Sequence, residues 1–133
     1  MADEESSLRI GVFDDSNTAR MVTQRLLTRA GYQAFLVESV SQLLQVIEQL
    51  DLLLMDLSLG DEDGREVART LRQRGGAAAR LPLIAVTAFA DPQLKNELQE
   101  AGFADYLHKP FRPQELYDKI ERWANLSPPD LAG

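Results

Sequence analysis

Cysteine is absent from this chain of 133 residues, and histidine and tryptophan each occur once. Without cysteine there is no disulfide framework, no thiolate metal site and no cysteine nucleophile, which suits a reducing compartment. The lone histidine, His108, cannot build a metal site of several histidines, and we interpret it as an edge residue. The residues that carry chemistry are therefore sought among carboxylates, hydroxyls and amines.

The chain also lacks an excess of positive charge and lacks long hydrophobic runs. Its net charge of −7 disfavours a surface that binds nucleic acid directly. No apolar run approaches the length of a membrane span, and the acidic start MADEESS is unlike a signal peptide. We expect a cytoplasmic protein that contacts no membrane.

Composition and length indicate one globular domain, with 44% hydrophobic and 26% charged residues. We expect the domain to cover residues 8–126. Residues 1–7 are predicted to be a disordered lead, and residues 127–133, rich in Pro and Gly, a flexible tail or a severed linker. The sequence allows both a single-domain protein and a domain taken from a larger one.

Short apolar runs alternate along the chain with amphipathic stretches. The run LLLM at 52–55 has no polar alternation, which is typical of a strand buried on both faces of a parallel sheet. Asn17 is predicted to cap the first helix, and glycines and prolines mark the other helix ends and starts. The predicted strands cover residues 8–13, 33–37, 52–55, 81–86 and 103–107, and the predicted helices 17–30, 40–47, 65–74, 92–102 and 113–123.

This alternation predicts a doubly wound α/β fold of the (βα)₅ type, flavodoxin-like, with a five-stranded parallel sheet in the order 2-1-3-4-5. In that order the first and third strands are neighbours about 4.8 Å apart, and ligands bind at their carboxyl ends. Asp14 and Asp15 follow the first strand, and Asp56 follows the third. We therefore expect these three carboxylates to share one cation.

A cluster of carboxylates needs a neutralising partner, because two of them about 5 Å apart repel by roughly 3 kcal/mol at an effective dielectric constant near 20. Mg²⁺ is such a partner, and it uses carboxylates, waters and phosphate oxygens as ligands. Asp56 is the candidate nucleophile, since a carboxylate that attacks phosphorus in line forms an aspartyl phosphate. Thr87 can donate its hydroxyl to a phosphoryl oxygen, and Lys109 can pair with another. The segment 61–64, DEDG, is interpreted as a helix cap rather than a calcium loop.

Taken together, these residues make the chain similar to the receiver domain of two-component response regulators. The matching pieces are FDDS at 13–16, LLLMD at 52–56, DEDG at 61–64, VTA at 86–88 and HKPF at 108–111. The resemblance implies that Asp14, Asp15, Asp56 and the backbone carbonyl of Ser58 hold Mg²⁺. It further implies that Asp56 accepts phosphate from a histidine kinase or a histidine phosphotransfer domain, while Thr87 and Lys109 contact the phosphoryl group. The peptide between Lys109 and Pro110 would be cis.

The resemblance also implies a switch. Thr87 moves toward the phosphoryl group, and the ring of Tyr106 turns inward and remodels the surface of the fourth helix, fifth strand and fifth helix for a downstream protein. One departure stands out, since Leu59-Gly60 replaces the Met-Pro pair usual after the nucleophile. We also hypothesise that the bulky Phe89 slows dephosphorylation. Such a domain is a signalling phosphoacceptor and not an enzyme acting on other substrates.

Three other functions are compatible with parts of this pattern. A flavodoxin-like cofactor binder has the same topology. Its first loop, however, would need hydroxyl and amide groups that donate hydrogen bonds to the cofactor's phosphate, where Asp14 and Asp15 stand and would repel it. A haloacid-dehalogenase-type phosphatase begins with Asp-x-Asp-x-Thr, and here Ser16 takes the place of the second aspartate. A pseudo-receiver would act as an interaction module without phosphorylation.

Overall fold

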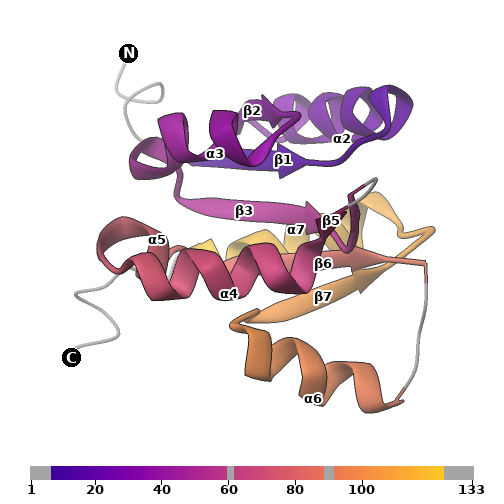
Figure 1. Cartoon of the computed structure of the whole chain (residues 1–133). Coiled ribbons are helices and arrows are strands. Elements are labelled where there is room, and N and C mark those ends of the chain that lie inside the picture. Colours follow the sequence, from indigo (N-terminus) through magenta and orange to yellow (C-terminus); the bar gives the residue numbers. More distant parts are fainter. Residues whose placement is uncertain (1–6, 60–61, 89–91, 125–133) are drawn as a thin grey trace.

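The computed structural model of the chain describes residues 7–59, 62–88 and 92–124 (Figure 1). Its strands are β1 (Arg9–Phe13), β2 (Gln33–Val37), β3 (Leu52–Asp56), β4 (Ser58–Leu59), β5 (Glu62–Asp63), β6 (Leu83–Thr87) and β7 (Asp105–His108). Its helices are α2 (Asn17–Arg29), α3 (Val40–Val46), the 3₁₀ helix η1 (Ile47–Gln49), α4 (Gly64–Arg74), α5 (Gly76–Arg80), α6 (Pro92–Ala101) and α7 (Pro113–Ala124). Residues 1–6, the predicted tail at 127–133 and Phe89 lie outside the described residues.

Five strands pair in parallel in the order β2-β1-β3-β6-β7. Taken in chain order, these are the first to fifth long strands, so the predicted order 2-1-3-4-5 is confirmed. β1 and β3 are direct neighbours, with Phe13 opposite Met55 in the register. On the other side of β3, Asp56 lies opposite Val86 of β6. All five carboxyl ends therefore meet at one edge of the sheet.

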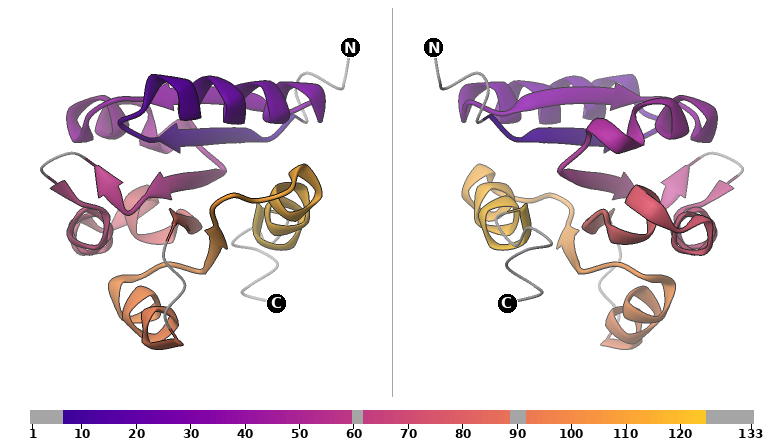
Figure 2. Two further views of the ribbon diagram at one scale, coloured as in Figure 1. Left: turned by 90° about the vertical axis from the view of Figure 1, so that its right-hand side faces the viewer. Right: turned by 90° about the vertical axis from the view of Figure 1, so that its left-hand side faces the viewer.

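Apolar side chains on both faces of the sheet explain why its strands carry no polar alternation. On one face, Ile10, Leu54 and Ile84 belong to a buried cluster that helices α2 and α7 complete. On the other face, Leu53 and Met55 pack in a second cluster with residues of α3, α4, α5 and α6. Figure 2 shows α7 on the opposite side of the sheet from α4 and α6. On α7, Leu116 and Ile120 are fully buried in the first of these clusters, and Trp123 is partly buried against it.

Helix ends follow ordinary capping rules, with one correction to the prediction. Ser16, not Asn17, caps α2, because its hydroxyl accepts the N–H of Ala19 while Asn17 is already the first helical residue. At the other end Gly31, with φ +90°, ends the helix as predicted. Asp63 caps α4 by accepting the N–H of Arg65, as the interpretation of the DEDG segment required.

Two strands begin two residues later than their apolar runs predict. The N–H of Phe103 bonds the carbonyl of Leu98, and the N–H of Leu81 bonds that of Ala77, so these residues complete the preceding helices. The sequence patterns also missed the short elements, namely α5, η1 and the antiparallel hairpin of β4 and β5. Each covers at most five residues, which is too short for an apolar period to show.

Arg72 ties the carboxyl end of α4 to two loops. Its guanidinium donates to the carbonyls of Ala79 and Leu81 at 2.8 Å each, and to that of Gly102. Burial lowers the pKa of Arg72, whose guanidinium is withdrawn from water and bonds backbone carbonyls. The backbone of Gly102 also requires glycine, since its φ is +106° and an added Cβ would lie 2.7 Å from Arg72 Cγ.

We predict that Arg72→Met destabilises the protein by about 1–3 kcal/mol, because the substitution leaves partly buried carbonyls without donors. The free energy of unfolding in urea measures the loss. Arg74→Met, on the exposed side of the same helix, is the matched control and should change stability by less than about 0.5 kcal/mol. Equal effects of the two substitutions would contradict the role assigned to Arg72.

Candidate functional site

Four neighbouring strands deliver a polar residue to the same edge of the sheet. Asp14 follows β1, Asp56 ends β3, Thr87 ends β6, and Lys109 follows β7. The parallel register explains the convergence, because strands that start level and run in one direction also end level. Asp15, next to Asp14, completes the group predicted from the sequence.

The three aspartates lie close enough to bind one ion. A carboxylate oxygen from each of Asp14, Asp15 and Asp56 can be chosen so that all three lie within 4.8 Å of one another. Asp14 is buried, Asp56 is half-buried and Asp15 is exposed. Carboxylate oxygens are hard ligands, and a group of them open to solvent on one side fits a small divalent cation that keeps several waters.

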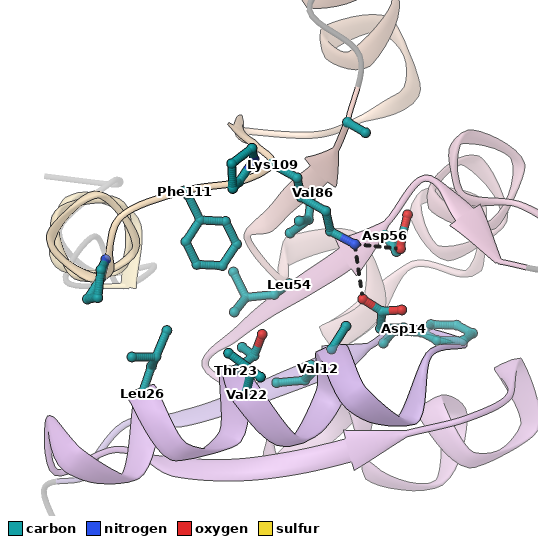
Figure 3. A pocket seen from close by; sticks show the side chains of 15 residues that line it. Val12, Asp14, Val22, Thr23, Leu26, Leu54, Asp56, Val86, Lys109 and Phe111 are labelled. Atoms are coloured by element: carbon teal, nitrogen blue, oxygen red, sulfur yellow. Dashed lines mark hydrogen bonds and ion pairs between the residues drawn. The ribbon is translucent and has the colours of Figure 1, made fainter.

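Lys109 reaches back over the acidic group from the far strand (Figure 3). Its Nζ lies 3.1 Å from Asp56 Oδ2 and 3.4 Å from Asp14 Oδ2. Burial alone lowers the pKa of Lys109, but its hydrogen bond to Asp56 and the charges of both aspartates outweigh burial and raise that pKa above the ordinary value. The ammonium therefore remains charged at neutral pH.

Burial has the larger influence on Asp14. Desolvation raises the pKa of its carboxyl, while the N–H of Ser16 and the charge of Lys109 act in the lowering direction without cancelling the rise. The negative charge of Asp56 adds to the increase. Ionising Asp14 in the folded protein therefore costs free energy, and a cation bound to its carboxylate would offset that cost.

Backbone donors fix the two acidic loops. The N–H of Ser16 donates to Asp14 Oδ1 at 2.9 Å, and the N–H of Ser58 donates to Asp56 Oδ1 at 2.8 Å. Each is a short turn closed by the aspartate itself, which leaves the second carboxylate oxygen for Lys109. The N–H of Lys109 in turn bonds the carbonyl of Thr87 at 2.7 Å, so β6 and β7 stay paired at the site.

Arg20 is a residue of the site that sequence reasoning missed. It is buried on α2, and its guanidinium donates to the backbone carbonyl of Asp14 and to Asn17 Oδ1. It also forms an ion pair at 3.5 Å with Glu38, which follows β2. Its place one turn into the first helix was visible in the sequence, but no spacing indicates that a side chain will bond a backbone carbonyl.

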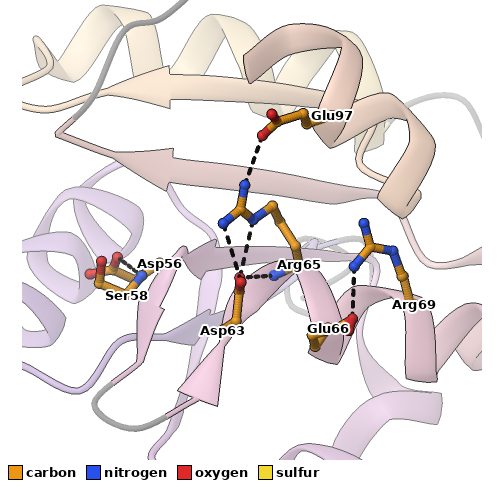
Figure 4. A network of polar contacts seen from close by, with 7 residues as sticks. All are labelled: Asp56, Ser58, Asp63, Arg65, Glu66, Arg69 and Glu97. Atoms are coloured by element: carbon orange, nitrogen blue, oxygen red, sulfur yellow. Dashed lines mark hydrogen bonds and ion pairs between the residues drawn. The ribbon is translucent and has the colours of Figure 1, made fainter. Parts of the chain in front are cut away.

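A second polar network extends from the loop after Asp56 (Figure 4). Arg65 pairs with Asp63 at 3.2 Å and with Glu97 of α6 at 2.7 Å. Beneath it, Gly64 lies so close to β3 that an added Cβ would stand 2.8 Å from the carbonyl oxygen of Asp56. The start of α4 is therefore held against the backbone of Asp56, and charged side chains connect it to α6.

The predicted switch residues lie on adjacent strands. Thr87 is buried at the end of β6, and Tyr106 is a half-buried residue of β7 that packs against the core cluster on the α6 side. His108 is exposed at the sheet edge, as interpreted from the sequence, with Nε2 3.2 Å from the carbonyl of Ala88. The peptide between Lys109 and Pro110 is cis, as the resemblance implied. Leu59, the first residue of the unusual Leu-Gly pair, is buried in β4, and Gly60 lies outside the described residues.

The sequence of this chain matches a known protein family. The response regulator receiver domain family matches residues 10–121, which contain every residue of the acidic group together with Thr87 and Lys109. The chain belongs to this family. The fold is therefore that of a receiver domain, and the resemblance found in the sequence is confirmed.

Individual relatives support the assignment. The receiver is 29% identical over 90% of its length to the sensor protein GacS of Pseudomonas syringae and 34% identical over 81% to the transcriptional regulatory protein GltR of Pseudomonas aeruginosa. These matches cover 14% and 45% of the two relatives, so the chain spans less than half the length of either. Among solved structures, the receiver domain of the sensor histidine kinase PA1611 from P. aeruginosa PAO1, with magnesium in its active-site cleft, superposes with a TM-score of 0.79 and 31% identity. That match covers 90% of this chain and 99% of the other.

We predict that, in the presence of a chelator, Asp14→Asn stabilises the receiver at pH 7 by about 1 kcal/mol. Because folding raises the pKa of Asp14, the folded receiver holds this proton more tightly than the unfolded chain does. Its free energy of unfolding therefore falls as pH rises from the ordinary value of 3.8 through the raised one. Urea unfolding at several pH values checks this.

The advantage of Asp14→Asn should disappear below pH 3.8, where both states of the parent carry a neutral carboxyl. Asp118→Asn, an exposed change on α7, serves as the control and should show no such pH-dependent gain. A gain at Asp14 that stays constant over the whole pH range would mean that charge burial is not its cause.

Proposed function

We propose that this receiver domain is the phosphoacceptor of a two-component pathway and that Asp56 takes the phosphoryl group from a phosphohistidine donor. One observation carries the proposal. Carboxylate oxygens of Asp56, Asp14 and Asp15 lie within 4.8 Å of one another, and Asp56 Oδ2 lies 3.1 Å from Lys109 Nζ. A carboxylate between a metal-binding group and a cation is suited to phosphoryl transfer, where catalysis consists mainly of positioning and charge stabilisation.

In the proposed transfer, Asp56 Oδ2 attacks phosphorus in line with the bond to the donor imidazole. The P–N bond breaks as the new P–O bond forms, and the imidazole keeps the electron pair and takes up a proton from solvent. Lys109 already touches Asp56 Oδ2 and is placed to pair with a phosphoryl oxygen. The hydroxyl of Thr87, at the end of the neighbouring strand, is proposed to donate to a second oxygen.

Mg²⁺ is the metal that the acidic group is proposed to hold. Asp14, Asp15 and Asp56 would supply carboxylate ligands, and the backbone carbonyl of Ser58 is proposed as a further one. When bound, the ion offsets negative charge that builds up on the phosphoryl oxygens. The fit rests on the donor set itself, which consists of hard oxygens, and on the burial of Asp14, which raises the pKa of its carboxyl even though Lys109 lies beside it.

Phosphorylation is proposed to act through Thr87 and Tyr106 on the face formed by α6, β7 and α7. On that face Asp105 accepts hydrogen bonds from Lys119 Nζ at 2.9 Å and from Trp123 Nε1 at 2.8 Å, which joins β7 to α7. A pocket of about 550 Å³ lies there between Tyr106, Lys119 and residues of α6. Its position beside the half-buried tyrosine supports this face as the surface that a downstream protein reads.

The partners and location follow from the same proposal. The phosphodonor is proposed to be a histidine kinase or a histidine phosphotransfer domain, and the setting to be cytoplasmic. Within the described residues no helix is long and apolar enough to span a bilayer. The domain bounds of 8–126 stay a prediction around the matched residues 10–121. Apart from its own phosphorylation and dephosphorylation, no enzymatic activity is proposed.

We predict that incubation with Mg²⁺ and acetyl phosphate adds one phosphoryl group to the protein and that Asp56→Asn abolishes the addition, because the amide is not a nucleophile. Intact-protein mass spectrometry measures the gain, and Asp118→Asn is the control. A phosphoryl group that still appears on Asp56→Asn would contradict the assignment of the acceptor. If the parent protein gains no phosphoryl group, a pseudo-receiver is favoured. If the protein instead hydrolyses acetyl phosphate continuously, a phosphatase is favoured.

We predict that Mg²⁺ stabilises the receiver against heat by binding the folded state. At ten times its dissociation constant the ion should add about 1.4 kcal/mol, a rise of roughly 3–6 °C in the unfolding midpoint. Differential scanning calorimetry measures this shift. Asp14→Asn should remove most of it, whereas the same concentration of Na⁺ should not reproduce it. A midpoint that does not respond to Mg²⁺ would argue against the site.

A further inference from the structure

Among the residues that the structure describes, Arg20 is the only basic one that is buried, with 6% of its surface exposed. Burying a guanidinium costs free energy, and the amino-terminal part of α2, where Arg20 stands, is also the end at which the helix dipole disfavours a cation. The carboxylate that pairs with it, Glu38, lies 3.5 Å away and is mostly exposed. Neither helix formation nor core packing therefore explains an arginine here, and the reason lies in its other contacts.

The guanidinium of Arg20 holds the turn that carries two of the three carboxylates. Helical side chains lean toward the amino end of their helix, and Arg20 accordingly reaches back over the first turn of α2. Its Nη1 donates to the backbone carbonyl of Asp14, and its Nη2 donates to Asn17 Oδ1. The backbone N–H of Arg20 donates to the carbonyl of Ser16 at 3.0 Å, so the helix fixes its main chain. The turn after β1 is thus braced against a regular element.

The carbonyl that Arg20 binds belongs to the peptide between Asp14 and Asp15. Because a peptide is planar, holding its oxygen fixes the directions in which both residues leave that plane. The carboxylate oxygens of Asp14 have donors as well, Oδ1 the N–H of Ser16 at 2.9 Å and Oδ2 the Nζ of Lys109 at 3.4 Å. Each of the three oxygens of Asp14 therefore has a donor, and the bond from Arg20 is the one that acts directly on the link to Asp15.

We propose that Arg20 is a positioning residue of the acidic group, which keeps the carboxylates of Asp14 and Asp15 at the separation that a small divalent ion requires and thereby favours Mg²⁺ over Ca²⁺. The inference rests on the proposed function, because it concerns the metal preference of the same group. Arg20 acts through the backbone of Asp14 and is not itself a ligand, since a guanidinium has no electron pair to offer a metal.

The size of the ion makes the spacing of the carboxylates decisive. Mg²⁺ binds oxygens at about 2.0–2.1 Å in a strict octahedron, whereas Ca²⁺ accepts roughly 2.3–2.6 Å and irregular arrangements. In this structure one oxygen from each aspartate lies within 4.8 Å of the others, although carboxylates repel one another and move apart when nothing restrains them. A turn released from Arg20 should therefore open toward the larger ion, and affinity for Mg²⁺ should fall more than affinity for Ca²⁺.

The test measures the dissociation constants of both ions by following backbone amide shifts of the purified receiver in NMR titrations. Arg20→Met keeps most of the apolar stem and donates no hydrogen bond. We expect its dissociation constant for Mg²⁺ to rise about tenfold, which is typical when a group that orients a metal ligand is removed. The constant for Ca²⁺ should rise by no more than about threefold. Arg25→Met, an exposed change five residues along the same helix, is the matched control and should keep the parent values.

Two further variants separate positioning from charge and from stability. Arg20→Lys keeps the charge but replaces the planar fork by a point charge, so its preference between the two ions should lie closer to that of Arg20→Met than to that of the parent. Parent-like preference in the lysine variant would overturn the positioning role, and this variant carries the test if urea unfolding shows that Arg20→Met does not fold. Arg72→Met, which is expected to lower stability away from the acidic group, should leave the preference unchanged.

The outcomes distinguish this inference from the proposed function. If the parent prefers Mg²⁺ and Arg20→Met keeps that preference, or loses affinity for both ions equally, the role assigned to Arg20 is wrong while the proposed function stands. A parent that binds Mg²⁺ no better than Ca²⁺ would likewise overturn the inference alone. A parent that binds neither ion would overturn both.

Discussion

Negative charge gathered at the carboxyl edge of the sheet is the constraint on which the rest of this receiver depends. Asp14 and Asp56 each contact the ammonium of Lys109, while Asp15 adds a third carboxylate to the group. One cation beside three anions leaves the group negative, and burial raises the cost at Asp14. A divalent ion held by the three carboxylates would offset that excess and would supply positive charge for a phosphoryl group. The cost of gathering the carboxylates and the proposed chemistry thus have the same origin.

The scaffold keeps this charge in place through its backbone rather than through side-chain packing alone. Parallel strands end level, so residues distant in the sequence arrive at one edge, and N–H groups of Ser16 and Ser58 orient the carboxylates there. Gly64 allows α4 to begin against the carbonyl of Asp56, where a Cβ would not fit. From that point Arg65 connects the loop to Glu97 on α6. Asp56 is therefore held by the hydrogen-bonded strand β3 and is connected to α6 through the ion pair of Arg65 and Glu97 at the surface.

Much of the fold and the polar group could be predicted from the sequence, since apolar runs buried on both faces fix the strands and polar residues directly after them fix the edge. Strand starts could not, because Leu81 and Phe103 are apolar and yet complete helix ends through backbone hydrogen bonds. The cap of α2 was misassigned because Ser16 and Asn17 are both good caps. Arg20 was missed because its partner is the carbonyl of Asp14, which every residue type carries.

An apolar pocket of about 660 Å³ beside Asp56, between α2 and the segment after Lys109, could not be predicted either, because it depends on how far α7 stands from α2, a distance that no local pattern encodes. Its walls are mainly apolar, and charges beside an apolar surface interact more strongly than charges in water. On the other side of Asp56 lie charged residues in contact with solvent. The acceptor therefore stands between an apolar and a charged surface, where an incoming phosphoryl group would pair with Lys109 while its remaining oxygens stay hydrated.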